Sequence, residues 1–140
     1  MAIRQLSIFA ENRKGTLHDI TDVLAKANIN LRSMCVADTS DYGIVRIIAD
    51  DPDGAKAALD RDGQTANLRH VNAFAVPDQP GGLAKVLSLL DSNGVNIEYM
   101  YALITTESGK AYSVVRTGNT EETDKILTEN GIELLDESKL

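Results

Sequence analysis

Apolar positions along the chain change twice from an extended pattern to a helical one. The apolar run 3–9 predicts a strand, and the stretch after Gly15 has apolar residues three and four positions apart, which predicts a helix ending near Asn28. A second apolar run, 71–76, is followed after Gly81 by another amphipathic stretch. The chain therefore contains the order strand, glycine loop and helix two times.

Further elements complete each half of the chain in the same order. In the first half, they are strands at 29–37 and 44–49 around the polar turn 38–43, a helix at 55–59 and a strand at 65–69. In the second half, they are a helix at 83–90, strands at 95–104 and 111–116, a helix at 120–127 and a strand at 132–135. Each half therefore has the βαββαβ order of a ferredoxin-like unit, which predicts an α+β fold with antiparallel sheets and both helices on one face.

The two halves also share residue types at a fixed spacing of 66 positions. The pairs that keep this spacing are Gly15 and Gly81, Leu17 and Leu83, Asn30 and Asn96, and Met34 and Met100. Such a shared spacing indicates an internal duplication. We therefore expect two domains, 1–69 and 70–140, with a boundary near His70.

The charge of the chain restricts its partners. The 140 residues include 14 basic and 21 acidic ones, which gives a net charge of −7 without a basic stripe. Nucleic acid and anionic membrane are therefore not expected as partners. The sequence has no apolar stretch near 20 residues, its start leads directly into a strand pattern, and it has one cysteine, so we expect a cytoplasmic protein.

The two glycine loops, 12–17 and 78–83, carry the candidate binding chemistry. Glycine lets a ligand approach the backbone, and a helix that begins there directs unpaired N–H groups at an anion. Side-chain oxygens of asparagine and aspartate accept hydrogen bonds from an ammonium group, so together these groups suit a free amino acid. The expected site residues are Asn12, Gly15, Thr16, Leu17 and Asn30 in the first half and Asp78, Gly81, Gly82, Leu83 and Asn96 in the second.

The same residue types also have purely structural roles. Asn12 and Asp78 are of the types that cap helices, and the two asparagines before the second strands are of the types that end turns. Thr16 with Asp19 resembles a capping box that fixes the start of the first helix. Both interpretations remain open at the level of the sequence.

Other chemistry has little support in the sequence. Cys35 alternates with Leu31 and Ser33, which predicts a thiol buried on the core face of its strand. The run Asp50, Asp51 and Asp53 fits the N-terminus of a helix better than a cation loop. The histidines and the cysteine lack metal-ligand spacing, so neither a metal nor another cofactor is expected. The sequence shows no pair of nucleophile and base, so catalytic activity is not expected either.

The loops and the segments after the helices carry a family resemblance. Glu11-Asn12-Arg13-Lys14-Gly15 with Ile29-Asn30-Leu31, and Asp78-Gln79-Pro80-Gly81-Gly82-Leu83 with Gly94-Val95-Asn96-Ile97, resemble the signatures of ACT domains. These domains are small-molecule regulatory modules of amino-acid metabolism, and the resemblance covers essentially the whole chain as two copies. The first copy is similar to the serine-sensing ACT domain of phosphoglycerate dehydrogenases, which implies that Asn12 and Asn30 hold an effector. The second copy keeps Asn96 but has Asp78 at the loop position.

The resemblance implies a tandem ACT sensor without catalytic activity that binds an amino acid and acts on itself or on a metabolic enzyme. Because ACT domains commonly pair through their second strands, we expect a homodimer with ligand sites at or near the interface. The alternative is an adaptor that assembles with an enzyme through its sheet edges and binds no ligand.

Overall fold

A computed structural model describes residues 2–38, 41–104 and 108–140. Part of the turn predicted at 38–43, and part of the segment between the strands predicted at 95–104 and 111–116, lie outside the described residues, at 39–40 and 105–107. The chain divides into two compact units, here called the N-terminal unit, which spans 4–69, and the C-terminal unit, which is formed mainly by 70–139. Within the described ranges, no helix combines the length and the apolar character needed to span a membrane.

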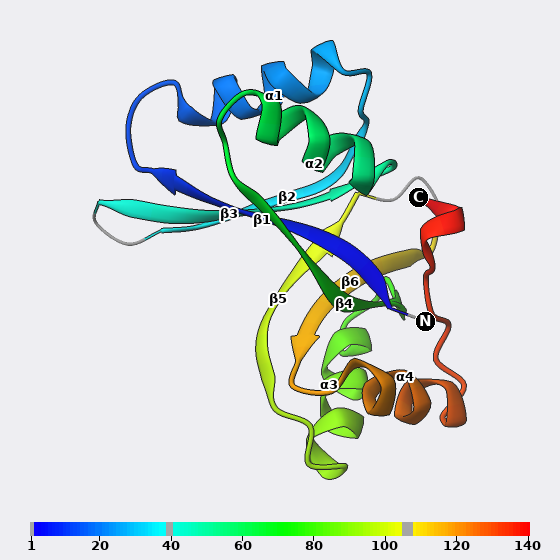
Figure 1. The fold of residues 1–140 in the computed structure, drawn as a ribbon. Coiled ribbons are helices and arrows are strands. Elements are labelled where there is room, and N and C mark those ends of the chain that lie inside the picture. The colour runs from blue at the N-terminus through cyan, green and yellow to red at the C-terminus, as the bar shows by residue number, and fades with distance from the viewer. Residues whose placement is uncertain (1, 39–40, 105–107) are drawn as a thin grey trace. The chain divides into compact units, whose positions relative to one another are not determined.

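The N-terminal unit is an antiparallel sheet with two helices on one of its faces (Figure 1). Its elements are β1 (Ile3–Glu11), α1 (Thr16–Lys26), β2 (Leu31–Asp38), β3 (Tyr42–Ala49), α2 (Pro52–Arg61) and the first part of β4 (Ala66–Pro77). The strand order is β2-β3-β1-β4, so β2 is an edge strand. This is the strand order of a ferredoxin-like unit.

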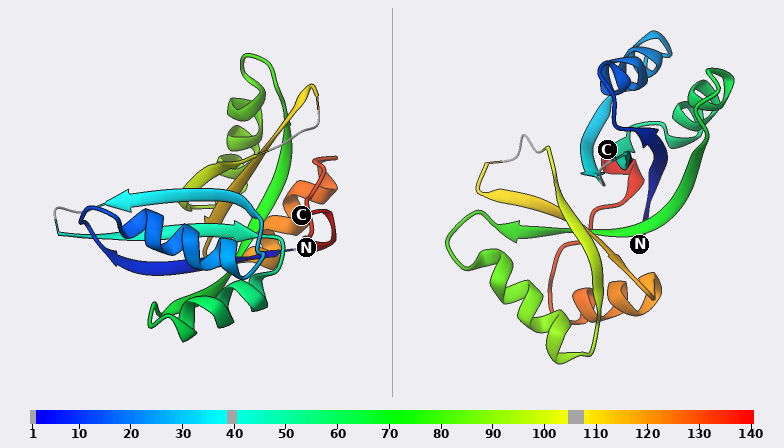
Figure 2. Two further views of the ribbon diagram at one scale, coloured as in Figure 1. Left: turned by 90° about the horizontal axis from the view of Figure 1, so that it is seen from above. Right: turned by 90° about the vertical axis from the view of Figure 1, so that its left-hand side faces the viewer.

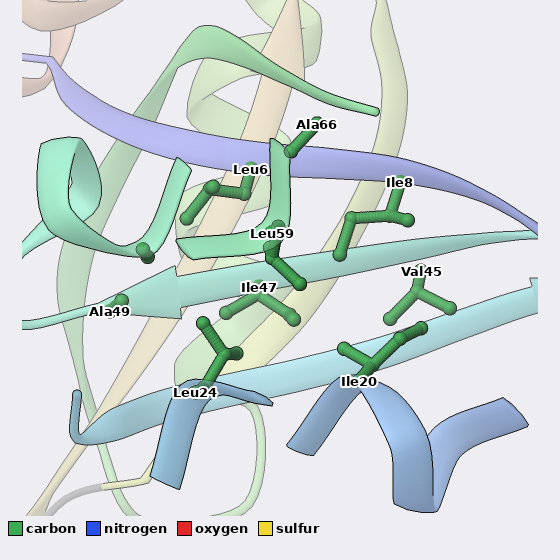
Figure 3. Close-up of a cluster of buried hydrophobic side chains, with 10 residues drawn as sticks. Leu6, Ile8, Ile20, Leu24, Val45, Ile47, Ala49, Leu59 and Ala66 are labelled. Carbon is green, nitrogen blue, oxygen red and sulfur yellow. The ribbon is translucent and has the colours of Figure 1, made fainter. Parts of the chain in front are cut away.

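The core of the N-terminal unit lies between the helices and the sheet (Figure 3). Ile20 and Leu24 of α1 are four residues apart and therefore lie on one side of that helix, where both are fully buried. Alternate residues of the strands meet them, because successive side chains of a strand point to opposite faces. The buried core consists of Leu6, Ile8, Ile20, Leu24, Val45, Ile47, Ala49, Ala55, Leu59 and Ala66.

The C-terminal unit repeats this arrangement, as the turned views also show (Figure 2). Its elements are the rest of β4, α3 (Gly82–Ser92), β5 (Ile97–Leu103), β6 (Lys110–Thr117), α4 (Thr120–Glu129) and the short helix η1 (Glu137–Lys139). The strand order is β4-β6-β5, so β5 is an edge strand. Its buried core consists of Phe74, Val76, Val86, Leu90, Val115, Ile126 and Leu127. The predicted α+β fold of two ferredoxin-like units is confirmed.

Three predicted strands differ from the structure. The strands expected at 65–69 and 71–76 form one continuous strand, β4, because no glycine or proline interrupts the sequence between Gly63 and Pro77. The strand expected at 132–135 is reduced to a single bridge between Phe74 and Leu134. Two backbone hydrogen bonds beside this bridge, with N–O distances of 2.9 Å, hold the segment against β4.

The predicted burial of Cys35 on the core face is wrong. The pairing of β2 with β3 is irregular between Leu31 and Ser33, which shifts the alternation of side chains by one residue. Cys35 consequently lies opposite Arg46, a residue on the sheet face away from the helices, and its side chain is only half-buried. The bulge, which the apolar pattern does not reveal, explains the difference.

Candidate functional site

The loop between β1 and α1 is a compact turn with a glycine at the helix start. The N–H of Asn12 donates to the carbonyl of Asp41 at 2.9 Å, and the N–H of Arg13 donates to the carbonyl of Glu11 at 3.0 Å. Gly15 is the N-cap residue of α1 and has a φ of 91°. This left-handed conformation is accessible to glycine and strained for residues with a side chain.

The first turn of α1 has no side-chain cap. The predicted capping box of Thr16 and Asp19 is therefore wrong, because the hydroxyl of Thr16 donates to the carbonyl of Glu11 at 3.1 Å. The N–H groups of Leu17 and His18 meet no acceptor in the part of the chain that the structure describes. These two donors, at the positive end of the dipole of α1, favour a negatively charged ligand group.

A hollow of 130 Å³ adjoins this helix start. Three predicted site residues line it, namely Asn12, Thr16 and Leu17. The other lining residues, which the sequence analysis did not identify, are Ala10, Glu11, Arg13, Val36, Gly43 and Val45. Four of these, Ala10, Val36, Gly43 and Val45, lie on the helix-covered face of β1, β2 and β3. They are neighbours because of the register in which the three strands pair.

The loop between β4 and α3 has the same hydrogen-bond pattern. The N–H of Asp78 donates to the carbonyl of Gly109 at 3.2 Å, and Gly81 is the N-cap of α3 with a φ of 81°. A Cβ atom on Gly82 would lie 2.2 Å from the carbonyl oxygen of Pro77, so the backbone permits only glycine there. Thr16 occupies the corresponding position of the first loop, and the second loop is therefore the tighter one at this point.

Leu83 is the second residue of α3 and corresponds to Leu17. Its N–H and that of Ala84 have no hydrogen-bond acceptor among the residues of known placement. The side chain of Asp78 makes no cap, since α3 begins without a side-chain hydrogen bond. The second loop thus presents the same pair of backbone donors as the first.

Asn30 lies at the end of the N-terminal sheet opposite to the glycine loop. Its N–H donates to a carboxylate oxygen of Asp50 at 3.0 Å, and its carbonyl accepts from the N–H of Asp50 at 3.1 Å. The eight residues of β2 separate it from the loop end, which corresponds to about 25 Å at 3.3 Å per residue. One unit therefore does not bring Asn30 and Asn12 together.

Asn96 has the corresponding place in the C-terminal unit and adjoins a hollow of 340 Å³. In the N-terminal unit, Asp50 is the residue that follows β3. The residue that follows β6 in the C-terminal unit is Gly118, which has no carboxylate. The hollow extends to the start of α4, where the side chain of Asn119 accepts from the N–H of Glu122 at 3.0 Å. The backbone of Asn96 therefore lacks the carboxylate partner that Asp50 provides to Asn30.

An acidic groove of 650 Å³ runs along α1 and the end of α2. Asp19, Asp22 and Asp62 contribute carboxylates to it. A hydrogen bond from Lys26, with an N–O distance of 2.8 Å, lowers the pKa of Asp22 and raises that of Lys26. Both side chains are solvent-exposed, so this pair is a surface ion pair of small energetic weight.

The acidic run before α2 has a structural role. Asp51 is the N-cap of α2, and its carboxylate accepts from the N–H of Gly54 at 3.0 Å. Asp53 lies in the first turn of the same helix. The interpretation of this run as a helix N-terminus is therefore confirmed, and within the described ranges no group of histidine, cysteine and carboxylate side chains has a metal-binding arrangement.

Comparison with known proteins identifies the family. A family model described as "ACT domain pair" matches residues 1–140. The chain belongs to the ACT domain pair family. A search of curated proteins gives no match.

Solved structures agree with this assignment. The chain is 43% identical to protein BT0572 from Bacteroides thetaiotaomicron, with a TM-score of 0.90 over 96% of this chain and 92% of that one. The fold is also similar to the regulatory subunit of aspartate kinase from Thermus thermophilus, with 16% identity and a TM-score of 0.65 over 91% of this chain and 92% of that one. The second similarity is one of fold alone, since the identity is low.

Proposed function

We propose that this ACT domain pair is a non-catalytic sensor that binds a free amino acid at its glycine loops. The observation that carries this proposal is the start of α1, where Leu17 and His18 present two unpaired N–H groups next to an accessible hollow. Backbone donors at a helix N-terminus bind a carboxylate without any catalytic group. The corresponding donors of Leu83 and Ala84 give the second loop the same capacity.

The polar side chains near each loop supply acceptors for the ammonium group. Asn12 lines the first hollow, and its side-chain oxygen is an acceptor for an N–H⁺ donor. Asp78 offers a carboxylate at the corresponding position, which pairs more strongly with an ammonium. The two loops consequently bind the same kind of head group with different strength.

A second chain completes each site in this proposal. Asn30 is too far from Asn12 within one unit to share a small ligand, and β2 is an edge strand with exposed apolar side chains at Met34 and Val36. Pairing of edge strands between two chains removes the unpaired backbone groups of both. A two-fold homodimer formed through the second strands is the arrangement that we propose, with Asn30 and Asn96 supplied near the loops of the partner.

The regulated partner is proposed to be a cytoplasmic enzyme of amino-acid metabolism. Two observations support this: membership of the ACT domain pair family, and the similarity in fold to a regulatory subunit of aspartate kinase. The resemblance of the first loop to serine-sensing domains makes serine a reference ligand. No cofactor is needed for binding or for a change in association.

The alternative function is an adaptor that binds an enzyme and no small molecule. The observation in its favour is the edge strand β2, where Met34 is 39% and Val36 is 45% exposed. An edge strand with exposed apolar side chains suits strand addition by a partner. The adaptor does not need the unpaired donors at the start of α1.

A thermal-shift screen of the twenty amino acids against the full chain separates the two functions. A ligand at one hundred times its dissociation constant adds about 2.7 kcal/mol to the unfolding free energy if it binds only the folded chain. The sensor predicts a raised melting temperature with at least one amino acid. No shift with any of the twenty, together with no heat in calorimetric titrations, would favour the adaptor.

A further inference from the structure

We infer that the hollow of the N-terminal unit selects an amino acid with a short aliphatic side chain, in preference to serine or threonine. This inference rests on the proposed function, because it concerns the side chain of the effector that the loop is proposed to bind. The evidence is the chemistry of the side chains that form the floor of the hollow.

Three strands form this floor. Ala10 of β1 is paired with Gly43 of β3, and Val36 of β2 is paired with Val45 of β3, all on the helix-covered face. These residues offer only methyl groups, and Gly43 adds no side chain. The side chain of Leu17 from α1 also lines the hollow and is 41% exposed. A ligand side chain that enters the hollow therefore meets apolar atoms.

The polar side chains that line the hollow either have hydrogen-bond partners within the chain or are exposed to solvent. The hydroxyl of Thr16 donates to the carbonyl of Glu11. The carboxylate of Glu11 is paired with Arg13, with a distance of 3.2 Å between Oε2 and Nε, and both side chains are largely exposed. Asn12 is assigned to the ammonium group of the effector. A ligand hydroxyl that is directed at the floor of the hollow would therefore lose contact with water and meet only methyl groups.

The size of the hollow matches a short side chain. Its 130 Å³ is about the volume of four water molecules in the liquid, at about 30 Å³ each. A short aliphatic side chain therefore fills the hollow. Valine and 2-aminobutyrate have side chains of this kind.

The corresponding positions of the C-terminal unit have a different character. Ser113 of β6 takes the place of Val45, and Ala102 of β5 takes the place of Val36, as the pairing of Ala102 with Ser113 shows. Ser113 is 7% exposed, so a hydroxyl lies close to the second loop where the first has a methyl group. The aliphatic floor is therefore a property of the N-terminal unit.

Valine and threonine are the appropriate probe pair, because they have nearly the same shape and differ in one hydroxyl. Calorimetric titration of the full chain with each amino acid is expected to show at least tenfold tighter binding of valine, as an apolar pocket discriminates against a hydroxyl by about 10- to 100-fold. 2-Aminobutyrate is expected to bind more tightly than serine for the same reason. Equal or tighter binding of serine and threonine would overturn the inference.

A substitution in the floor of the hollow tests whether the hollow causes the preference for valine over threonine. Val36→Thr, at an exposed position of a strand, is expected to reduce the ratio of valine to threonine affinity by about threefold to tenfold, since the new hydroxyl can pair with that of threonine. Ala102→Thr places the same group beside the second loop and is expected to leave the ratio at the first loop, measured from the amide shifts of Leu17 and His18, unchanged. An unaltered ratio in Val36→Thr, or an equal change in Ala102→Thr, would overturn the assignment.

The outcomes also separate this inference from the proposed function. Binding of serine with a higher affinity than valine would contradict the inference and support the sensor. Absence of binding by all twenty amino acids and by 2-aminobutyrate would contradict both.

Discussion

Asn12 and Asn30 lie at opposite ends of the N-terminal sheet, one bonded through its N–H to the carbonyl of Asp41 and the other to the carboxylate of Asp50. The strand β2 lies between the two ends. An amino acid spans only a few ångströms, so one ligand cannot contact both asparagines of the same unit. If both asparagines hold the effector, a second chain has to supply one of them.

The first prediction is therefore a homodimer at micromolar concentration, measured by multi-angle light scattering. Met34→Lys places a charge on the exposed edge of β2 and is expected to shift the chain toward the monomer, because charged edge strands resist pairing. Ala102→Lys places a charge on the edge strand β5, the second strand of the C-terminal unit, and is expected to shift the chain toward the monomer in the same way. A wild-type chain that remains monomeric with and without ligand would contradict the dimer.

The second prediction concerns the ammonium acceptor. Asn12→Ala is expected to weaken binding at the first loop by about 1–3 kcal/mol, because a polar ligand group loses its partner. Asn93→Ala removes a side-chain amide that donates to the carbonyl of Leu89 at the end of α3, so it is a matched control that is expected to keep the affinity. Calorimetric titration measures both variants. Equal affinities of the two would show that Asn12 has a structural role only.

The third prediction separates two neighbouring glycines. A Cβ atom on Gly81 would contact no other atom, but the left-handed backbone conformation is strained for alanine. Gly81→Ala is therefore expected to lower the unfolding free energy by about 1–2 kcal/mol. Gly82→Ala is expected to cost more, since its Cβ would collide with the carbonyl of Pro77. Urea unfolding gives both values, and an equal or smaller cost for Gly82→Ala would contradict the close approach.

Gly81→Val is expected to abolish binding at the second loop while the fold remains.

The fourth prediction is a pH dependence of stability that involves Asp60. A hydrogen bond from Lys56 at 2.7 Å, and a second from the N–H of Ala66, lower the pKa of Asp60 below its ordinary value of 3.8. The stabilisation is therefore complete above the unfolded pKa and is lost as the pH falls through the folded pKa. Asp60→Asn is expected to be less stable than the parent at pH 6 and to lose less stability between pH 5 and pH 3.

A double-mutant cycle with Lys56→Gln tests the cause of that dependence. If Lys56 supplies the larger part, Asp60→Asn has a smaller effect on the unfolding free energy in the Lys56→Gln background. Denaturant unfolding at pH 6 of the four chains gives the coupling. Strict additivity would assign the pKa change to the backbone N–H of Ala66.

The fold could be predicted because local signals in this sequence are strong. Gly15 and Gly81 mark the change from an extended to a helical pattern, and both have the left-handed conformation that favours glycine. The end of the first helix near Asn28 was predicted for the same reason, and that residue has a φ of 59°. Features that depend on tertiary contacts were predicted less well, as the single bridge at Leu134 illustrates.

The candidate site could be predicted only in its loops. Val36 and Val45 meet through the register of β2 and β3, and the bulge in β2 shifts that register by one residue. The same bulge moved Cys35 to the face away from the helices. The type and spacing of Thr16 predict a capping box, whereas its hydroxyl donates to the carbonyl of Glu11 across the loop. Such contacts depend on the path of the backbone.

The most direct test of the central claim is an NMR titration of the ¹⁵N-labelled chain with the amino acid that raises the melting temperature most. A carboxylate bound at the start of α1 accepts from the N–H groups of Leu17 and His18, so these amides are predicted to show large downfield shifts that saturate with the calorimetric affinity. Corresponding shifts at Leu83 and Ala84 would report occupancy of the second loop. Saturable shifts confined to residues outside both loops, with these four amides unchanged, would contradict the account.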